Sequence, residues 1–94
     1  MKVTFTEFFS ISNKGILIDI RDSESYLKGH VPGAKNILSS ELLYHASSYL
    51  NYNDTYYLYC DVGYLSDDLC KRLRLLGFRV FSIVGGYQNY LFRE

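Results

Sequence analysis

Three short, nearly unbroken apolar segments place the strongest constraint on how this chain can fold. They are residues 16–20, 55–60 and 79–84. Segments of this length without polar alternation are typical of strands that are buried on both faces, as in a parallel sheet. The weaker segments 3–5 and 35–37 would add short strands to the same sheet.

Two segments between these runs have the periodicity of amphipathic helices. In residues 39–50 apolar side chains recur three or four positions apart, and Ser39 or Ser40 would cap the first turn. Residues 66–76 have acidic side chains in the first turn, basic ones later, and Gly77 as a stop signal. Because strands and helices alternate along the chain, we predict an α/β fold in which right-handed crossovers connect the strands of a mostly parallel sheet.

The composition is typical of one compact domain without a strong electrostatic field. With 94 residues, 48% of them hydrophobic, the chain is predicted to form a single domain over residues 1–94. Ten basic and ten acidic residues give a formal net charge of zero, so the charge balance indicates no nucleic acid and no membrane as a partner. Residues 1–7 contain no long apolar core before Glu7, and nowhere do about 18 apolar residues run together. We therefore expect a cytoplasmic protein.

Cys60 stands where a parallel sheet places its ligands. It is the last residue of the predicted central strand, and ligands bind beyond the carboxyl ends of such strands. A short loop joins it to a helix start, where backbone N–H groups bind anions. These groups would favour the thiolate, which is the reactive form of a thiol, and equally the terminal anion of a persulfide. We predict Cys60 as the catalytic nucleophile, with an active-site loop of Asp61, Val62, Gly63, Tyr64, Leu65 and Ser66.

Cys70, the second cysteine, has a structural interpretation. It lies on the apolar face of the predicted helix with Leu69 and Leu73, so we predict a core side chain. A role as a resolving thiol stays open. In reducing cytosol both cysteines would remain free thiols.

Several short motifs follow one another in a fixed order. Asp19 and Arg21 form a D-x-R motif, and residues 26–37 read Y-L-K-G-H-V-P-G-A-K-N-I. Residues 60–66 read C-D-V-G-Y-L-S, and a glycine pair follows the third apolar run. Over residues 16–90 this order resembles the rhodanese family, whose signature is D-x-R followed by Y-x-x-G-H-I-P-G-A-x-N-I, and whose active loop is C-x-x-G-x-R-S.

The resemblance implies a three-layer α/β/α fold with a mostly parallel, five-stranded sheet. It also implies that Cys60 carries sulfane sulfur as a persulfide. The sulfur would come from thiosulfate, another small sulfur donor or a protein persulfide, and would leave to a nucleophilic acceptor in a double displacement. No metal or organic cofactor is implied. Asp19, Arg21 and His30 belong to the signature, and we interpret all three as structural residues.

The active loop departs from the family pattern at two positions. Leu65 stands where an arginine is common, and Asp61 stands where a basic or polar residue is common. The loop therefore has no cation of its own. Asp61, Asp67 and Asp68 bring negative charge to the helix start, and such charge opposes thiolate formation. We hypothesise that the loop handles thiosulfate, a dianion, poorly and that a persulfide donor suits it better.

Two alternative functions are left open by the sequence. Phosphatases and arsenate reductases related to this fold place an arginine five residues beyond their cysteine to bind the oxyanion, and this chain has Ser66 there. With Ser66 at that position, the chain lacks the guanidinium that would bind the oxyanion. The second alternative is a low-activity or non-catalytic regulatory or interaction module of the same fold, which Asp61 and Leu65 favour. Retention of Cys60 favours the sulfurtransferase.

Overall fold

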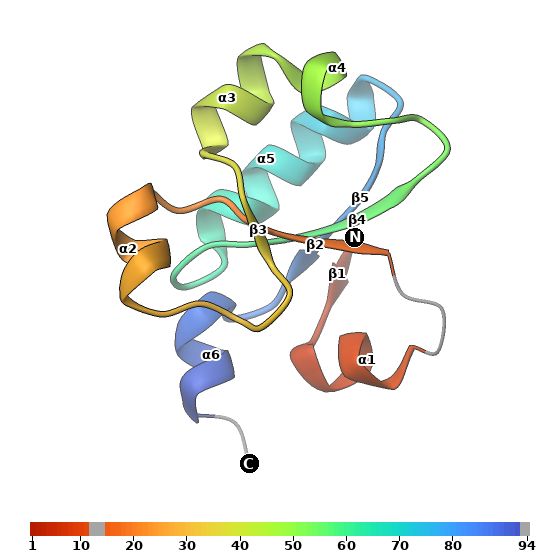
Figure 1. Cartoon of the computed structure of the whole chain (residues 1–94). Coiled ribbons are helices and arrows are strands. Elements are labelled where there is room, and N and C mark those ends of the chain that lie inside the picture. Colours follow the sequence, from red (N-terminus) through yellow and green to blue (C-terminus); the bar gives the residue numbers. More distant parts are fainter. Residues whose placement is uncertain (12–14, 93–94) are drawn as a thin grey trace.

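A parallel sheet positions the rest of the molecule. The computed structural model describes residues 1–11 and 15–92, and within them five strands form one all-parallel sheet in the order β1-β5-β4-β2-β3 (Figure 1). The strands are β1 (Lys2–Val3), β2 (Ile16–Asp19), β3 (Lys35–Asn36), β4 (Thr55–Tyr59) and β5 (Arg79–Ile83). The predicted α/β fold class is confirmed. β4, which leads to Cys60, lies in the middle of the sheet.

Helices cover both faces of this sheet. They are α1 (Phe5–Ser10), α2 (Ser23–Lys28), α3 (Ser39–Tyr44), α4 (Ala46–Tyr49), α5 (Tyr64–Leu75) and α6 (Gly86–Phe92). Figure 1 shows α3, α4 and α5 together on one side, with α1 and α6 on the other. Among the described residues, no helix is long and apolar enough to cross a bilayer.

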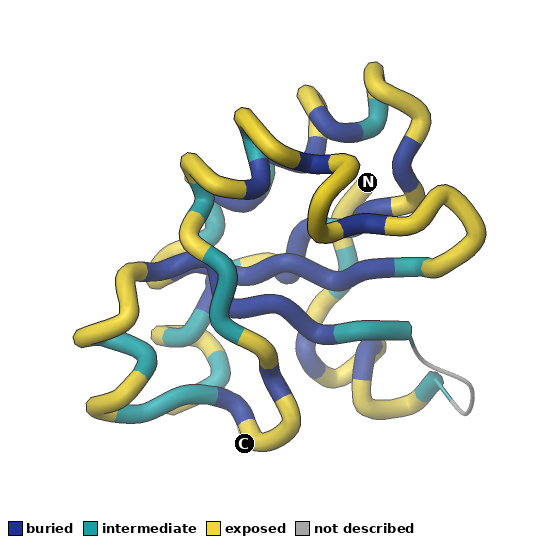
Figure 2. The backbone as a smooth tube through the Cα atoms, turned by 45° about the horizontal axis from the view of Figure 1, so that its top comes forward, coloured by how far each residue is buried: buried dark blue, intermediate teal, exposed yellow. Residues whose placement is uncertain are grey.

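Side chains alternate across the strands and build two separate cores. In β4, Tyr56 and Leu58 pack in a cluster with side chains of α3, α4 and α5. Tyr57 and Tyr59 point to the opposite face, where they pack with side chains of α1 and α6. This burial on both faces is why the sequence of β4 shows no polar alternation. Figure 2 shows most of the neighbouring strands β2 and β4 as buried.

The prediction of one helix over residues 39–50 is wrong. The structure has two short helices, α3 and α4, which are separated at His45 (φ −133°, ψ 38°). This segment is rich in serine and tyrosine, whose helix propensity is weak. The N-cap is Leu38, with no side-chain hydrogen bond, instead of Ser39 or Ser40. The N–H of Ser39 donates to the carbonyl of Ile20 at 3.1 Å, which ties the start of α3 to the end of β2.

The predicted strand at residues 3–5 gives way to a helix after Val3. Thr4 Oγ1 accepts a hydrogen bond from the N–H of Glu7 at 3.0 Å, and Glu7 Oε1 accepts one from the N–H of Thr4 at 2.9 Å. This reciprocal capping box starts α1 at Phe5. The T-x-x-E pattern in the sequence is the signal that would have predicted this helix.

The predicted boundaries beside Cys60 differ from the structure by one or two residues. β4 ends at Tyr59, so Cys60 is the first loop residue and not the last strand residue. α5 begins at Tyr64 instead of Ser66, with Gly63 as its N-cap. Ser66 therefore belongs to the first turn of α5.

Candidate active site

The sulfur of Cys60 lies at the start of α5, where backbone donors converge on it. The N–H groups of Gly63 and Ser66 donate to Cys60 Sγ at 3.1 and 3.4 Å. Gly63 has a left-handed φ of 100°, a conformation that glycine adopts without strain. This turn folds the loop back over the sulfur, so that amides at the N-terminus of a 12-residue helix face it. An anionic sulfur at this place is stabilised by those amides and by the helix dipole.

A pair of buried hydroxyl groups supports the sulfur from the protein interior. Ser66 Oγ accepts a hydrogen bond from the Cys60 thiol at 3.5 Å, donates to the carbonyl of Gly63 at 3.2 Å, and lies 2.8 Å from Ser82 Oγ. Ser66 and Ser82 are 0% and 1% exposed. Ser82 was not among the site residues predicted from the sequence. Its signal was a polar residue inside the third apolar run, which a buried strand tolerates only when the hydroxyl has a partner.

The glycine pair at the start of α6 holds the other side of the loop. Gly86 has a left-handed φ of 58°, and a Cβ at this position would collide with the backbone of Cys60 and Asp61. This close approach lets the N–H of Tyr87 donate to the carbonyl of Cys60 at 2.7 Å, and the N–H of Gln88 donate to that of Asp61 at 3.0 Å. The backbone that carries the sulfur is thus fixed from two helices.

Asp19, the last residue of β2, and Arg21, two residues later, form a buried ion pair. Arg21 Nη2 lies 2.7 Å from Asp19 Oδ2, and Nε and the backbone N–H of Arg21 also donate to the same carboxylate. Nη2 donates in addition to the carbonyl of Gly29 at 2.7 Å. Burial lowers the pKa of Arg21, but its hydrogen bonds to Asp19 and Asp61 and the charge of Asp19 outweigh burial, so the net shift is upward. These contacts hold residues 21–29 in place beside the sulfur.

The side chain of His30 makes its contacts away from the sulfur of Cys60. Its Nδ1 lies 2.8 Å from the carbonyl oxygen of Tyr26, and its ring stacks on the ring of Tyr26 at a centroid distance of 3.7 Å. His30 does not line the pocket that contains Cys60. Among the described residues, no group of three or more His, Cys, Asp and Glu side chains could hold a metal ion.

Each of the three carboxylates near the start of α5 has a cationic partner. Asp61 Oδ1 lies 3.3 Å from Arg21 Nη1. The carboxylate of Asp67 lies 3.5 Å from the ammonium of Lys2 and 3.6 Å from that of Lys71, and Asp68 pairs with Arg72 at 3.1 Å. The negative charge that these carboxylates bring near the sulfur is therefore partly offset by cations. The loop has no cation of its own, but cations from β1, α5 and the segment after β2 pair with Asp61 in the loop and with Asp67 and Asp68 in α5.

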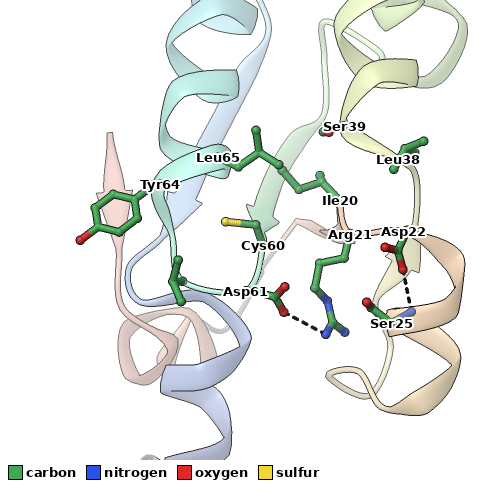
Figure 3. Close-up of a pocket in the computed structure, with 11 residues that line it drawn as sticks. Ile20, Arg21, Asp22, Ser25, Leu38, Ser39, Cys60, Asp61, Tyr64 and Leu65 are labelled. Atoms are coloured by element: carbon green, nitrogen blue, oxygen red, sulfur yellow. Dashed lines mark hydrogen bonds and ion pairs between the residues drawn. The ribbon is translucent and has the colours of Figure 1, made fainter.

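A pocket of about 430 Å³ opens beside the sulfur. Figure 3 shows Ile20 and Leu65 on one side of Cys60, and Arg21 with Asp61 on the other. Its walls come from the segment after β2, the segment before α3, and the loop with the start of α5. The lining residues are Ile20, Arg21, Asp22, Ser25, Leu38, Ser39, Cys60, Asp61, Val62, Tyr64 and Leu65. Cys60 itself is 4% exposed, and its side chain is part of the pocket wall.

Cys70 is placed in the core, as predicted. It is 1% exposed and packs in the cluster that α5 forms with the sheet. Burial raises the pKa of the Cys70 thiol to about 12. Both cysteines are free thiols.

Comparison with known proteins gives a consistent result. A family model described as "Rhodanese-like domain" matches residues 6–92. A tRNA sulfurtransferase of Pyrobaculum aerophilum is 36% identical over 77 residues, which cover 82% of this chain and 16% of the relative. The putative sulfur carrier protein YrkF of Bacillus subtilis is 32% identical over 75 residues, which cover 79% of this chain and 40% of the relative.

Among solved structures, SSP1007 of Staphylococcus saprophyticus has a TM-score of 0.85 and 26% sequence identity, and the match covers 95% of this chain and 91% of that one. The chain therefore spans less than half the length of the two curated relatives, but nearly the whole of this solved structure.

Proposed function

Because the chain belongs to the rhodanese-like domain family, we propose that it is a sulfurtransferase that carries sulfane sulfur as a persulfide on Cys60. The names of two relatives, tRNA sulfurtransferase and putative sulfur carrier protein, support sulfur transfer as the general class of function. The observation that carries the proposal is the convergence of the Gly63 and Ser66 N–H groups on Cys60 Sγ. Such donors stabilise the thiolate that must attack, and the persulfide anion that results.

The reaction consists of two displacements at sulfur. The Cys60 thiolate attacks the sulfane sulfur of a persulfide RS–SH, a new S–S bond forms, and RS⁻ leaves with the electron pair of the broken bond. With thiosulfate as the donor, the leaving group is sulfite. A nucleophilic acceptor such as cyanide then attacks the outer sulfur, and Cys60 departs as the thiolate. Release of the first product before the acceptor reacts predicts ping-pong kinetics.

The pocket suits the organic part of a persulfide donor. Leu38, Val62 and Leu65 are exposed apolar side chains that line it, and burial of such surface by a donor is favourable. The donor would be a small persulfide or the persulfide of a partner protein. Thiosulfate gains little from these walls and carries two negative charges, so we expect it to be the poorer donor.

An intact-mass experiment tests the carrier function. The reduced protein is incubated with an organic persulfide, and the mass increase of one sulfur atom is measured before and after treatment with a thiol acceptor. We expect one added sulfur on the wild type and on Cys70→Ala, and none on Cys60→Ser. Absence of added sulfur on the folded wild type would contradict the proposal and favour the non-catalytic module.

The phosphatase alternative has no support from the pocket geometry. Ser66, which occupies the position of the oxyanion-binding arginine in those enzymes, is buried and faces Ser82 and Cys60 instead of the pocket. Arg21 lines the pocket, but three of its donors go to Asp19 and Gly29. We therefore expect no hydrolysis of an aryl phosphate by the purified protein.

A further inference from the structure

We propose that Asp61 determines donor specificity, because its carboxylate pairs with Nη1, the guanidinium nitrogen of Arg21 that the contacts with Asp19 and Gly29 leave unused. The pocket then selects donors whose sulfane sulfur is attached to an uncharged group. This inference rests on the proposed function and names the substrate class of the same site. It concerns a residue that differs from the usual family pattern, and its basis is the set of contacts around Arg21.

The charges that line the pocket are few and already engaged. Among the described lining residues, Arg21 is the single cation, and Asp22 and Asp61 are the anions. The carboxylate of Asp22 caps α2, where it accepts from the N–H of Ser25 at 2.8 Å. The carboxylate of Asp22 is therefore engaged as the N-cap of α2. The charge of Asp22 is the same in the wild type and in any variant of Asp61, so the effect of Asp61 on a donor depends on its contact with Arg21.

The guanidinium of Arg21 offers only Nη1 toward the pocket. Nε donates to Asp19, and Nη2 donates to Asp19 and to the carbonyl of Gly29. The planar group lies over the ring of Tyr87 at 4.3 Å, which covers one of its faces. Nη1 lies 3.3 Å from Asp61 Oδ1, and Figure 3 shows this pair at the side of the pocket next to Cys60.

The two partners differ in how firmly they are held. The side chain of Arg21 is 8% exposed, whereas that of Asp61 is 59% exposed. Arg21 is fixed by its buried contacts, and Asp61 reaches it from the solvent side. We therefore expect that the carboxylate of Asp61 can be removed without disturbing the buried pair of Asp19 and Arg21.

The local charge explains how Asp61 would discriminate between donors. Asp19, Arg21 and Asp61 together carry a net charge of −1, because two carboxylates share one guanidinium. A thiosulfate dianion that approaches the Cys60 thiolate meets this excess negative charge, and like charges within a few ångströms repel. A persulfide with an uncharged organic group carries at most one negative charge, on its terminal sulfur, and therefore meets a smaller penalty. Without the carboxylate at position 61, the group of charges is neutral and Nη1 is free to bind an anion.

The test compares two donors on the wild type and Asp61→Asn. The donors are thiosulfate and 2-hydroxyethyl persulfide, whose organic part is uncharged, and the measured quantity is kcat/KM for sulfur transfer to cyanide at low ionic strength. We expect Asp61→Asn to raise kcat/KM for thiosulfate about tenfold, which corresponds to about 1.4 kcal/mol in the transition state. The value for the persulfide, which carries at most one negative charge, should change by less than about threefold, which corresponds to less than about 0.7 kcal/mol.

Asp68→Asn is the matched control. Asp68 lies in the first turns of α5, pairs with Arg72 at 3.1 Å, and does not line the pocket. The Asp68→Asn substitution removes one negative charge, as Asp61→Asn does, but leaves the contact between Asp61 and Arg21 intact. We therefore expect kcat/KM for thiosulfate to change by less than about twofold. Thermal unfolding shows whether each variant is folded, and Asp61→Ser serves as a second variant of the same position.

Three outcomes are distinguishable from the expected one. An equal gain in Asp68→Asn would mean that net charge, and not the contact with Arg21, sets the preference. An equal gain for both donors in Asp61→Asn would mean that Asp61 acts on Cys60 itself. Either result overturns the specificity role and leaves sulfur transfer intact. If neither donor adds sulfur to Cys60 in the wild type or the variants, the proposed function fails and this inference fails with it.

Discussion

Ser66 Oγ and Ser82 Oγ lie 2.8 Å apart beneath the sulfur of Cys60, and both side chains are buried. A hydroxyl group has one proton to donate. When Cys60 is a thiolate, the proton of Ser66 is best directed at the sulfur, and Ser82 can then donate to Ser66. The hydroxyl protons of Ser66 and Ser82 can thus reorient when the charge on Cys60 changes, with no movement of the backbone.

We predict that Ser82→Ala slows the reaction of Cys60 without unfolding the protein. Loss of one hydrogen bond to Ser66 removes about 1 kcal/mol, so alkylation of Cys60 by iodoacetamide at neutral pH should slow about fivefold. Samples quenched at successive times and analysed by intact mass give the alkylation rate. Ser47→Ala, at an exposed position of α4, should react like the wild type. A wild-type rate in Ser82→Ala would show that the second hydroxyl does not support the sulfur.

Asp19→Asn should destabilise the fold strongly, because it leaves the charge of Arg21 buried without its main partner. Breaking a buried pair in this way removes about 3–5 kcal/mol from the free energy of unfolding. Urea unfolding followed by circular dichroism measures the loss. Asp68→Asn breaks an exposed i,i+4 pair with Arg72 and should remove less than about 0.5 kcal/mol. Similar losses in the two variants would contradict a structural role for Asp19.

Alkylation should separate the two cysteines. Cys70 is buried and burial raises its pKa to about 12, so at pH 8 it is a neutral, inaccessible thiol. Iodoacetamide should therefore label Cys60 alone in the native protein and both cysteines in urea. Peptide mapping identifies the sites. Labelling of Cys70 in the native state at a rate comparable with that of Cys60 would reopen its role as a resolving thiol.

The same thiol makes stability depend on pH. The pKa of Cys70 rises from 9.0, its ordinary value, to about 12 in the folded protein. The folded state thus keeps a proton that the unfolded state loses, and the resulting stabilisation is complete below about pH 9 and declines as the pH rises from there toward 12. Between pH 8 and 10 the decline should be about 1 kcal/mol. Cys70→Ala should decline less than the wild type in urea unfolding at the two pH values.

The close approach at Gly86 should be essential for the active loop. A Cβ there would meet the backbone of Cys60 and Asp61, whereas a Cβ at Gly33 would meet no atom within 4 Å, although both glycines have positive φ. Gly33→Ala should therefore show only the backbone strain, about 1–2 kcal/mol. Gly86→Ala should lose more stability than Gly33→Ala and should also lower the labelling rate of Cys60 in the folded protein. Equal effects on stability and labelling would argue against this contact.

Much of the fold could be predicted from local patterns. The three apolar runs correspond to β2, β4 and β5, and the periodic segment after Ser66 corresponds to α5, with shifts of one or two residues at the ends. The short helices α1, α2 and α6 were not predicted, and one helix was predicted where α3 and α4 are separated. Helices of four to seven residues contain too few repeats for a periodicity of 3.6 to stand out.

The placement of Cys60 and its loop between a strand and a helix start could be predicted from the sequence alone, because strand, loop and helix start are neighbours along the chain. The residues that contact this loop from other parts of the chain could not be predicted in this way. Arg21 and Asp61 are 40 positions apart, and Ser66 and Ser82 are 16 apart. These pairs meet because β2 and β5 lie on either side of β4 in the folded sheet. Local periodicity carries no information about which side chains the sheet brings together, so only the tertiary structure decided which charge and which hydroxyl stand beside the sulfur.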